Sequence, residues 1–364
     1  MTQAKSPNRT SARPRNVAAP PSPETTIEIG GWKLAVFGAL IALALVVGLA
    51  IRFARSSAGA RMQAQLMLVS VPVPEPAALL EMEPDVQHAI AAARAAVEAD
   101  RGSAVAWRHL GMIYDAHSIW PLAVTAYQRA LSMAPTDGQT AYYLAVATEM
   151  SDAPIDDILA AYKHAIALAP TYGPARLRLG DALMRVGRHV EARDVLMQAV
   201  NVYPPAESAR ARRSLGLALI ALGDADGAVV SLEAATRIRD DDANTFTALA
   251  QAYNQLNRGQ DARRATDRAA QLRESLGYFD NWRKAVLEEA VSRSLVETRI
   301  MQKMEVGVPD QALADALRWE AKHPDWQSIK VLIGNLHRTA GREDLAKPYF
   351  EAATALIKQG GKTK

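Results

Sequence analysis

Few side chains in this sequence have the types and the spacing that chemistry needs. The seven histidines show no zinc-binding pattern such as H-E-x-x-H. Glu288 and Glu289 are adjacent, so on a helix they point about 100° apart and cannot form a facing pair of carboxylates. Gly361-Lys362-Thr363 ends like a phosphate-binding loop, but Leu356 stands where the first glycine of that loop belongs. The sequence therefore predicts a protein that is not an enzyme, with no catalytic residue, no metal site and no cofactor.

The composition narrows the classes of function further. The net charge is only +3 over 364 residues, so the molecule as a whole does not resemble a nucleic-acid binder. The absence of cysteine excludes disulfides, thiolate metal sites and covalently attached c-type haem. Apolar residues make up 49% of the chain, which is ample for a buried core. These observations favour function through binding.

The N-terminal segments predict a tail and a membrane anchor. Residues 1–31 are rich in Pro, Ser, Thr and Arg, a composition that predicts a disordered tail of the cytoplasmic type. Residues 32–54 predict a single transmembrane helix, because the run from Leu34 to Ile51 is apolar and uncharged. As a helix this run spans roughly 27 Å, close to the ~30 Å hydrocarbon core of a bilayer. A cleaved signal peptide is the alternative, since Ala58-Gly59-Ala60 resembles a cleavage site.

Residues 55–84 connect the predicted anchor to the rest of the chain. The stretch from Arg61 to Val71 predicts a short interfacial helix. The closely spaced prolines from Pro72 to Pro76 favour an extended chain. They predict a stiff spacer that holds the following residues away from the bilayer.

Trp107 to Pro135 is the stretch around which the rest of the chain is organised. Trp107, Leu110 and Tyr114 lie three and four residues apart, so they share one face of a helix. Gly111 sits among them, where a missing side chain lets a second helix come close. Pro135 ends that second helix, because a proline inside it would lose a hydrogen bond. The second helix carries its own apolar series, namely Ala123, Tyr127 and Ala130.

These positions match the signature of the tetratricopeptide repeat, and the chain resembles this family. Glycine or alanine recurs every 34 to 36 residues at the position of Gly111, namely at 145, 180, 216 and 250. The resemblance implies an all-α superhelical solenoid over 85–273, in which residues 85–100 form a capping helix. It implies a further repeat-like unit over 324–358, followed by a flexible tail at 359–364.

The repeat register breaks over residues 274–323, where we expect a divergent pair of helices. Two helical patterns, about 281–305 and 310–322, are separated by Gly307-Val308-Pro309. The first pattern is too long for one repeat helix. A degenerate repeat and a partner-specific insertion both fit this region.

The resemblance implies that the first helix of each repeat lines a concave groove that binds protein segments. Transferring the family's inward positions onto this chain gives a protein-binding groove of twelve residues: Arg108, Met112, Tyr142, Val146, Arg178, Asp181, Arg185, Arg210, Arg213, Leu217, Gln251 and Asn254. Arginine is frequent in the third and fourth repeats, and a guanidinium pairs well with a carboxylate. We therefore expect a partner segment that carries acidic residues. The alternative is that these arginines form a solvated surface that needs no partner.

Two other kinds of partner receive weaker support. Asp181, Asp194 and the acidic run Asp240-Asp241-Asp242 interrupt the basic field, which disfavours nucleic acid. Gly38 and Ala42 form a small-xxx-small pair in the predicted span, a pattern compatible with self-association of that helix.

The sequence thus predicts a membrane-anchored scaffold that captures partner segments. By analogy with cytochrome c maturation factors and translocon-associated repeat proteins, the expected setting is assembly or quality control of an envelope complex. The alternative is a non-catalytic regulatory or accessory subunit of a membrane enzyme complex, such as a glycosyl-transfer system. Basic residues are nearly balanced across the predicted span, so orientation rests partly on resemblance to anchored repeat proteins. We expect a single-pass protein of a bacterial-type inner membrane with its soluble domain in the periplasm.

Overall fold

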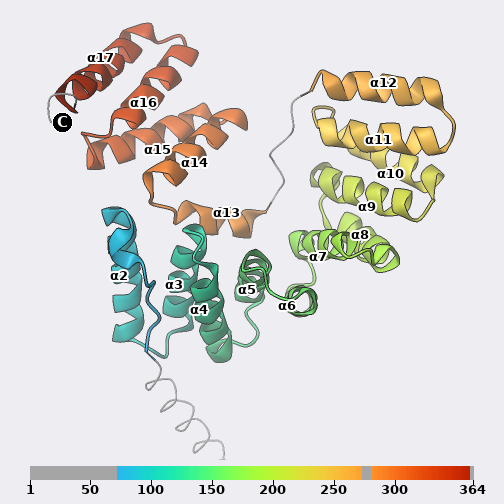
Figure 1. The fold of residues 1–364 in the computed structure, drawn as a ribbon, viewed down its shortest axis with the longest axis horizontal. Helices are drawn as coiled ribbons and strands as arrows, with labels where there is room; N and C mark the ends of the chain where they lie inside the picture. Colours follow the sequence, from blue (N-terminus) through green and yellow to red (C-terminus); the bar gives the residue numbers. More distant parts are fainter. Residues whose placement is uncertain (1–71, 273–279, 361–364) are drawn as a thin grey trace, which may run out of the picture. The chain divides into compact units, whose positions relative to one another are not determined.

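The computed structural model describes residues 72–272 and 280–360, and these residues form α-helices joined by short turns (Figure 1). No strand occurs in these two ranges. All of them belong to one compact unit, Met67–Lys364. The helices are α2 (Pro84–Ala99), α3 (Ala104–Ala116), α4 (Trp120–Met133), α5 (Gly138–Met150), α6 (Ile155–Leu168), α7 (Gly173–Arg185), α8 (His189–Val202), α9 (Ala209–Ala221), α10 (Ala225–Ile238), α11 (Ala243–Gln255), α12 (Gly259–Ala270), α13 (Asn281–Glu288), α14 (Arg293–Glu305), α15 (Pro309–Lys322), α16 (Gln327–Thr339) and α17 (Glu343–Gly360).

Helices α3 to α12 form five consecutive hairpins that stack on one another, and this confirms the all-α repeat architecture for the described part of the chain. Each hairpin turn contains one residue with a positive φ angle. Glycine supplies it at Gly187 and Gly223, while Ser118, Asp152 and Asn257 adopt the same conformation elsewhere. This left-handed residue ends the first helix and lets the chain reverse.

Close approach of the two helices explains the recurring small residue. A Cβ atom added at Gly111 would lie 2.6 Å from the ring of Tyr127 in the partner helix, and one added at Gly180 would lie 2.5 Å from Leu196. Both distances are far below a van der Waals contact. The large residue follows the glycine by 16 positions in each case, so one spacing sets the packing of both hairpins.

Aspartates at helix starts couple neighbouring repeats. Asp137 precedes α5 and accepts hydrogen bonds from the backbone N–H groups of Gln139 and Thr140, which satisfies otherwise free donors of the first turn. The same carboxylate pairs with Arg108 of the preceding repeat at 2.8 Å. Asp242 caps α11 and pairs with Arg213 at 2.5 Å in the same way. An arginine on one repeat therefore fixes the start of the next.

Three clusters of buried apolar side chains lie in the described residues. The first extends from Val73 through the repeats to Ala218 and also takes in Val286 and Ala290. The second belongs to α9–α12. The third is formed by α14, α15 and α16, with Ile300 and Ile333 fully buried in it. The C-terminal helices thus have a core of their own.

The region 274–323 differs from the sequence expectation. The helical pattern over 281–305 is divided into α13 and α14, so the described residues 280–323 hold three helices with α15 rather than two. The guanidinium of Arg299 explains the break, since its Nη1 donates to the carbonyl oxygens of Glu288 at 3.2 Å and Ala290 at 2.9 Å. These carbonyls would otherwise be left without partners at the end of α13.

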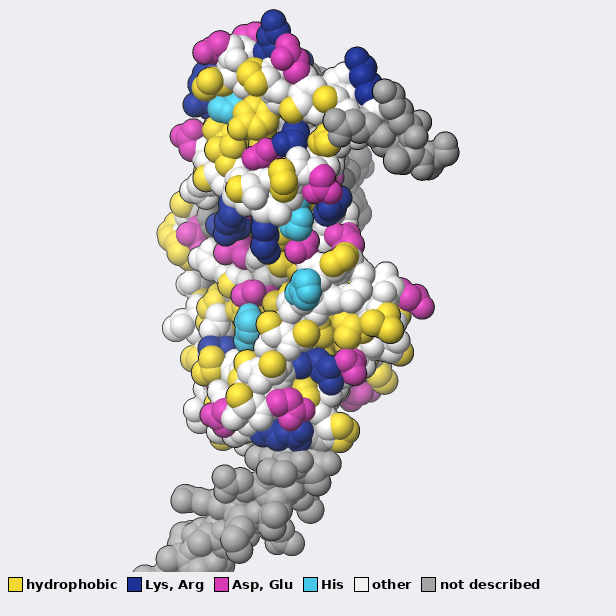
Figure 2. Space-filling view, turned by 90° about the vertical axis from the view of Figure 1, so that its left-hand side faces the viewer, with side chains coloured by type: hydrophobic (Ala, Val, Ile, Leu, Met, Phe, Trp, Pro, Cys, Tyr) yellow, Lys and Arg dark blue, Asp and Glu magenta, His cyan; other side chains and the backbone are white. Residues whose placement is uncertain are grey.

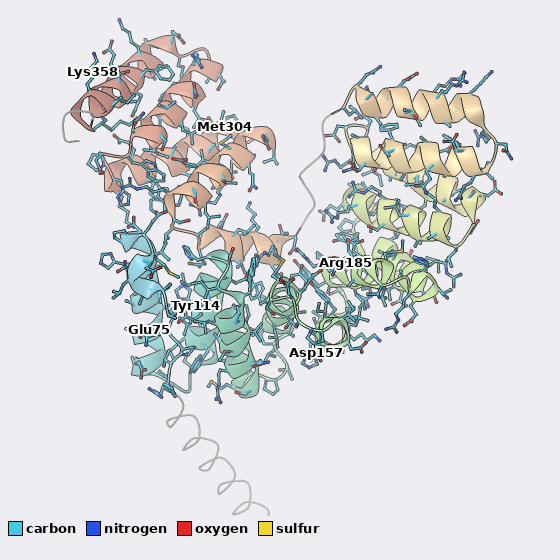
Figure 3. The ribbon with its side chains drawn as sticks, viewed as in Figure 1. Glu75, Tyr114, Asp157, Arg185, Met304 and Lys358 are labelled. Atoms are coloured by element: carbon cyan, nitrogen blue, oxygen red, sulfur yellow. The ribbon has the colours of Figure 1, made fainter. Side chains whose placement is uncertain are left out.

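The proline segment at residues 72–76 also differs from the expected stiff spacer. Residues 72–76 do not stand apart from the repeats, because Val73 is only 4% exposed within the first core. The hydroxyl of buried Tyr114 donates to the carbonyl of Pro74 at 2.5 Å, and Arg94 pairs with Glu75 at 2.5 Å. A buried hydroxyl needs an acceptor, and the proline segment supplies it. Tyr114 and Glu75 are labelled in Figure 3.

The predicted anchor and interfacial helix lie outside the described residues. Within 72–272 and 280–360, the helices are too short or too polar to cross a membrane.

Substitution of Gly111 tests the helix approach. Gly111→Ala places a methyl group against the Tyr127 ring, and overpacking of this kind costs about 1–3 kcal/mol despite the better helix propensity of alanine. Gly259→Ala is the matched control, since nothing lies within 4 Å of a Cβ added there. Urea unfolding should show a lower midpoint for the first variant and an unchanged or higher midpoint for the second. Equal midpoints would refute the packing argument.

Candidate protein-binding surface

The twelve sequence-predicted groove residues divide into a covered group and an open group. In the first three repeats, Tyr142 and Val146 are fully buried, although the resemblance placed them on an accessible surface. In the fourth and fifth repeats, Leu217, Gln251 and Asn254 are exposed. For Tyr142 the cover is a later part of the same chain, which lies against the first repeats.

That later part is α13, which packs on α3 and α5 (Figure 1). Asp280 precedes the helix and accepts a hydrogen bond from the backbone N–H of Arg283 at 2.8 Å. Its carboxylate also accepts from the hydroxyl of Tyr142 at 2.5 Å and from that of Tyr172 at 2.7 Å. Nε of Arg178 lies 3.8 Å from the same carboxylate. Asp280 is 7% exposed, so it is a buried charge, and its donors come from the second and third repeats.

An aromatic stack continues the contact. The indole of Trp282 stacks on the ring of Tyr172 with their centroids 3.6 Å apart, and it lies 5.8 Å from the ring of Tyr142. The backbone N–H of Trp282 donates to the Tyr172 hydroxyl at 3.1 Å. Tyr172 therefore recognises α13 through both its ring and its hydroxyl.

A buried ion pair forms the third part. Nη1 of Arg283 lies 2.6 Å from Oδ2 of Asp115, whose side chain is completely inaccessible. The hydroxyl of Tyr127 donates to the same oxygen at 3.3 Å. Burial raises the pKa of Asp115, although the Arg283 guanidinium opposes the shift. Burial alone would lower the pKa of Arg283, but the attraction of Asp115 outweighs it and raises that pKa.

The chain stays in contact with the first repeats beyond α13. The imidazole of His109 lies 3.5 Å from Glu289. His117 donates from Nδ1 to the carbonyl of Ile113 at 2.8 Å, so its neutral ring accepts at Nε2 from the backbone N–H of Val291 at 3.2 Å. This acceptor role requires the neutral imidazole.

The arginines predicted for the groove all have acidic partners within the chain. The pairs are Arg108 with Asp137, Arg178 with Glu149 and Asp280, Arg185 with Glu149, Arg210 with Asp181, and Arg213 with Asp242. Arg185 is labelled in Figure 3 and is half exposed. Internal carboxylates thus supply the acidic groups that the sequence analysis assigned to a partner. On the face shown in Figure 2, basic and acidic side chains are likewise interspersed.

The open group lies at equivalent positions of successive repeats. Leu217 follows Gly216 on α9 and Gln251 follows Ala250 on α11. Leu217 is 37% exposed, and Gln251 and Asn254 are also exposed. The corresponding residues of the first two repeats are Met112, which is half-buried, and Val146, which is fully buried. At the positions predicted for the groove, the side chains are therefore exposed in the fourth and fifth repeats, half-buried in the first and fully buried in the second.

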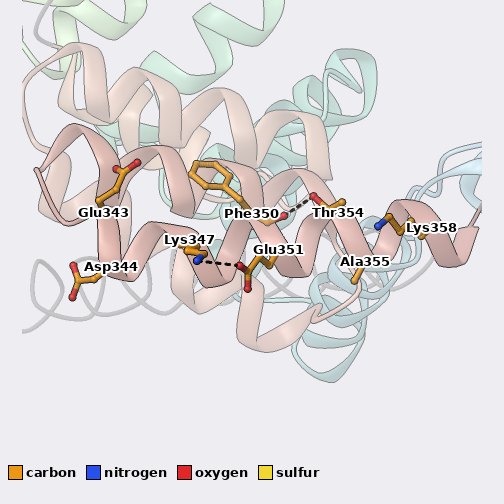
Figure 4. Close-up of a pocket in the computed structure, with 8 residues that line it drawn as sticks. All are labelled: Glu343, Asp344, Lys347, Phe350, Glu351, Thr354, Ala355 and Lys358. Carbon is orange, nitrogen blue, oxygen red and sulfur yellow. Dashed lines mark hydrogen bonds and ion pairs between the residues drawn. The ribbon is translucent and has the colours of Figure 1, made fainter.

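A separate shallow pocket lies on α17 alone (Figure 4). Phe350 and Ala355 contribute apolar surface, and Lys347 pairs with Glu351 at 3.9 Å across it. Because all lining residues come from one face of a single helix, they do not surround a position at which a substrate atom could react. Among residues 72–272 and 280–360, no group of three His, Asp or Glu side chains is placed to hold a metal ion.

Comparison with known proteins agrees with the repeat signature. Family models of the tetratricopeptide repeat match residues 85–138, 155–215 and 328–359, so the chain contains tetratricopeptide repeats. No curated protein matches the sequence.

Several solved structures are similar to parts of this chain. MamA from Desulfovibrio magneticus RS-1 is 18% identical with a TM-score of 0.43, over 46% of this chain and 94% of that one. YrrB, described as a TPR protein with an unusual peptide-binding site, is 18% identical with a TM-score of 0.44, over 50% and 91%. PilF of Pseudomonas aeruginosa is 19% identical with a TM-score of 0.42, over 62% and 93%.

Sequence reasoning missed the residues that cover the first repeats. Asp280 before a helix is a recognisable N-cap, and an aspartate there was open to detection. Its partners Tyr142 and Tyr172 lie 138 and 108 residues away in the sequence, however. No local pattern connects residues at such separations.

The two histidines predict an optimum pH for the contact of α13 with α3. The hydrogen bond to Glu289 raises the pKa of His109 above 6.5 although burial opposes it, so its stabilisation is complete below 6.5 and is lost as pH rises through the raised pKa. Burial lowers the pKa of His117 below 6.5, so its stabilisation is complete above 6.5 and is lost as pH falls through the lowered pKa. We expect the strongest contact near pH 6.5.

Hydrogen exchange of residues 281–291, corrected for the intrinsic pH dependence of amide exchange, measures this contact. Protection should be greatest near pH 6.5 and should decline on both sides. His109→Ala should remove the decline on the alkaline side only. A pH-independent protection pattern would contradict the roles given to both histidines.

Proposed function

We propose that the protein is a membrane-tethered scaffold that binds a partner protein on the inner face of its fourth and fifth repeats. The tetratricopeptide repeats make it a protein-interaction module, and the tether is the apolar run from Leu34 to Ile51. The expected setting is assembly or quality control of an envelope complex, with the repeats in the periplasm. Loss of the full chain from carbonate-washed membranes would remove the tether from this proposal.

The accessible side chains at equivalent repeat positions carry the proposal. Leu217 offers apolar surface, while Gln251 and Asn254 offer amide donors and acceptors on the next repeat. Such a surface fits a partner segment that combines an apolar side chain with backbone or amide hydrogen-bonding groups. An acidic partner segment receives less support than the sequence indicated, because internal carboxylates already pair with Arg210 and Arg213.

An accessory subunit of a membrane enzyme complex is the second candidate. It would use the same surface, but for one stoichiometric enzyme rather than for several clients. Recovery of a single enzyme with the solubilised full chain would favour it, and recovery of several unrelated proteins would favour the scaffold.

Site-specific photo-cross-linking tests the proposed surface. A photoreactive residue at Gln251 should give adducts to a discrete partner in cells, because this side chain is exposed at a position predicted for the groove. A photoreactive residue at Val230 is the matched control, since Val230 is 68% exposed but lies on the second helix of its hairpin. We expect at least tenfold more adduct at position 251. Equal labelling at the two positions would refute the assignment of the inner face.

A further inference from the structure

The contact between α13 and the first repeats has the composition of a recognition site. Its anchors are a carboxylate, an indole and a guanidinium from Asp280, Trp282 and Arg283. The repeats provide a complementary group for each anchor: a tyrosine hydroxyl for the carboxylate, a tyrosine ring for the indole and a carboxylate for the guanidinium. Interiors that serve stability alone are mostly apolar, because removing two charges from water costs more than a comparable apolar contact.

We propose that α13 is an intramolecular ligand of the first three repeats, and that this face exchanges it for a partner segment of the same chemistry. The partner segment would carry a carboxylate, an aromatic ring two residues later and a guanidinium directly after the ring. This inference rests on the proposed protein-binding function and adds a second binding surface with its own specificity.

Each of the three anchor groups of α13 is contacted by different groups of the repeats. The hydroxyls of Tyr142 and Tyr172 both donate to the carboxylate, so an amide in its place would leave one hydroxyl facing a second donor. The flat ring of Tyr172 requires a flat ring opposite it. The buried carboxylate of Asp115 requires a cation.

The apolar contacts of α13 lie on one side of it, against the first repeats. Val286 and Ala290 are buried in that core, and Trp282 and Val291 pack against it. The following helices α14, α15 and α16 pack around their own core, which contains no residue of α13. Displacement of α13 therefore uncovers the rings of Tyr142 and Tyr172, which a partner segment of the same chemistry would cover again, and leaves the core of α14–α16 in place.

Covalent connection makes α13 a strong competitor for its own site. A linked ligand has an effective concentration on the order of millimolar, so a free segment of equal intrinsic affinity binds the intact chain weakly. Loss of the internal anchors should remove this competition without changing the face itself, because Asp280 and Arg283 belong to the ligand.

A peptide with the sequence of residues 280–291 tests the exchange. Labelled with a fluorophore, it is titrated against the full chain in detergent micelles, and binding is followed by fluorescence anisotropy. We expect at least tenfold tighter binding to the Asp280→Ala/Arg283→Ala variant than to the unsubstituted chain. A peptide carrying the same two substitutions should bind neither. Lys284→Ala is the matched control, since Lys284 is exposed on the same helix, and it should bind the peptide as weakly as the unsubstituted chain.

The following results would overturn the inference. Equal affinity for the variant and the unsubstituted chain, or no binding to either, would show that the face does not accept α13 as a ligand. If the double variant loses helix content, Trp282→Ala is measured instead, because it removes the stack and keeps the N-cap and the ion pair. Loss of helix content in that variant too would make α13 an integral part of the core. A concentration-dependent dimer that Asp280→Ala abolishes would assign the ligand to a second copy.

Failure of this test is distinguishable from failure of the proposed function. Cross-linking from Gln251 reports on the fourth and fifth repeats and does not involve α13.

Discussion

A single buried carboxylate connects two parts of the chain that are more than 100 residues apart. Asp280 caps α13 and at the same time accepts hydrogen bonds from Tyr142 and Tyr172 on the repeats. Because a buried charge must be paired or hydrogen-bonded, these donors fix where α13 can lie. Tyr142 is buried beneath this contact, whereas Leu217, Gln251 and Asn254 on the fourth and fifth repeats are exposed.

The arginines at the predicted groove positions have a structural role: they form ion pairs between neighbouring repeats. Arg108 and Arg213 each pair with the aspartate that caps the next repeat, so each links one hairpin to the start of the following one. Glu149 receives both Arg178 and Arg185 from the neighbouring repeat. These pairs couple adjacent units in the manner that gives repeat proteins their nearest-neighbour stability. What remains for recognition is a surface of mixed apolar and amide character.

The local features of the fold could be predicted from the sequence, and the long-range ones could not. The tetratricopeptide repeat signature identified the hairpins, because Gly111 and Tyr127 follow a spacing that operates within one repeat. It failed at residues 281–305, where Arg299 stabilises an end of α13 that no helix-breaking residue marks. It also failed to show that Tyr142 is buried, since the covering group comes from another part of the chain. The exposed positions Gln251 and Asn254 were predicted from the repeat pattern and are accessible in the structure.

A distance measurement between α13 and the repeats tests this account most directly. The chain has no cysteine, so Lys284→Cys on α13 and Lys163→Cys on α6 create two unique sites for spin labels, both at exposed positions. Electron double resonance on the full chain should give one narrow distance distribution, and Asp280→Ala should broaden it while helix content is retained. A distribution that is already broad in the unsubstituted chain, or one that Asp280→Ala leaves narrow and unshifted, would contradict the central role of the Asp280 contact.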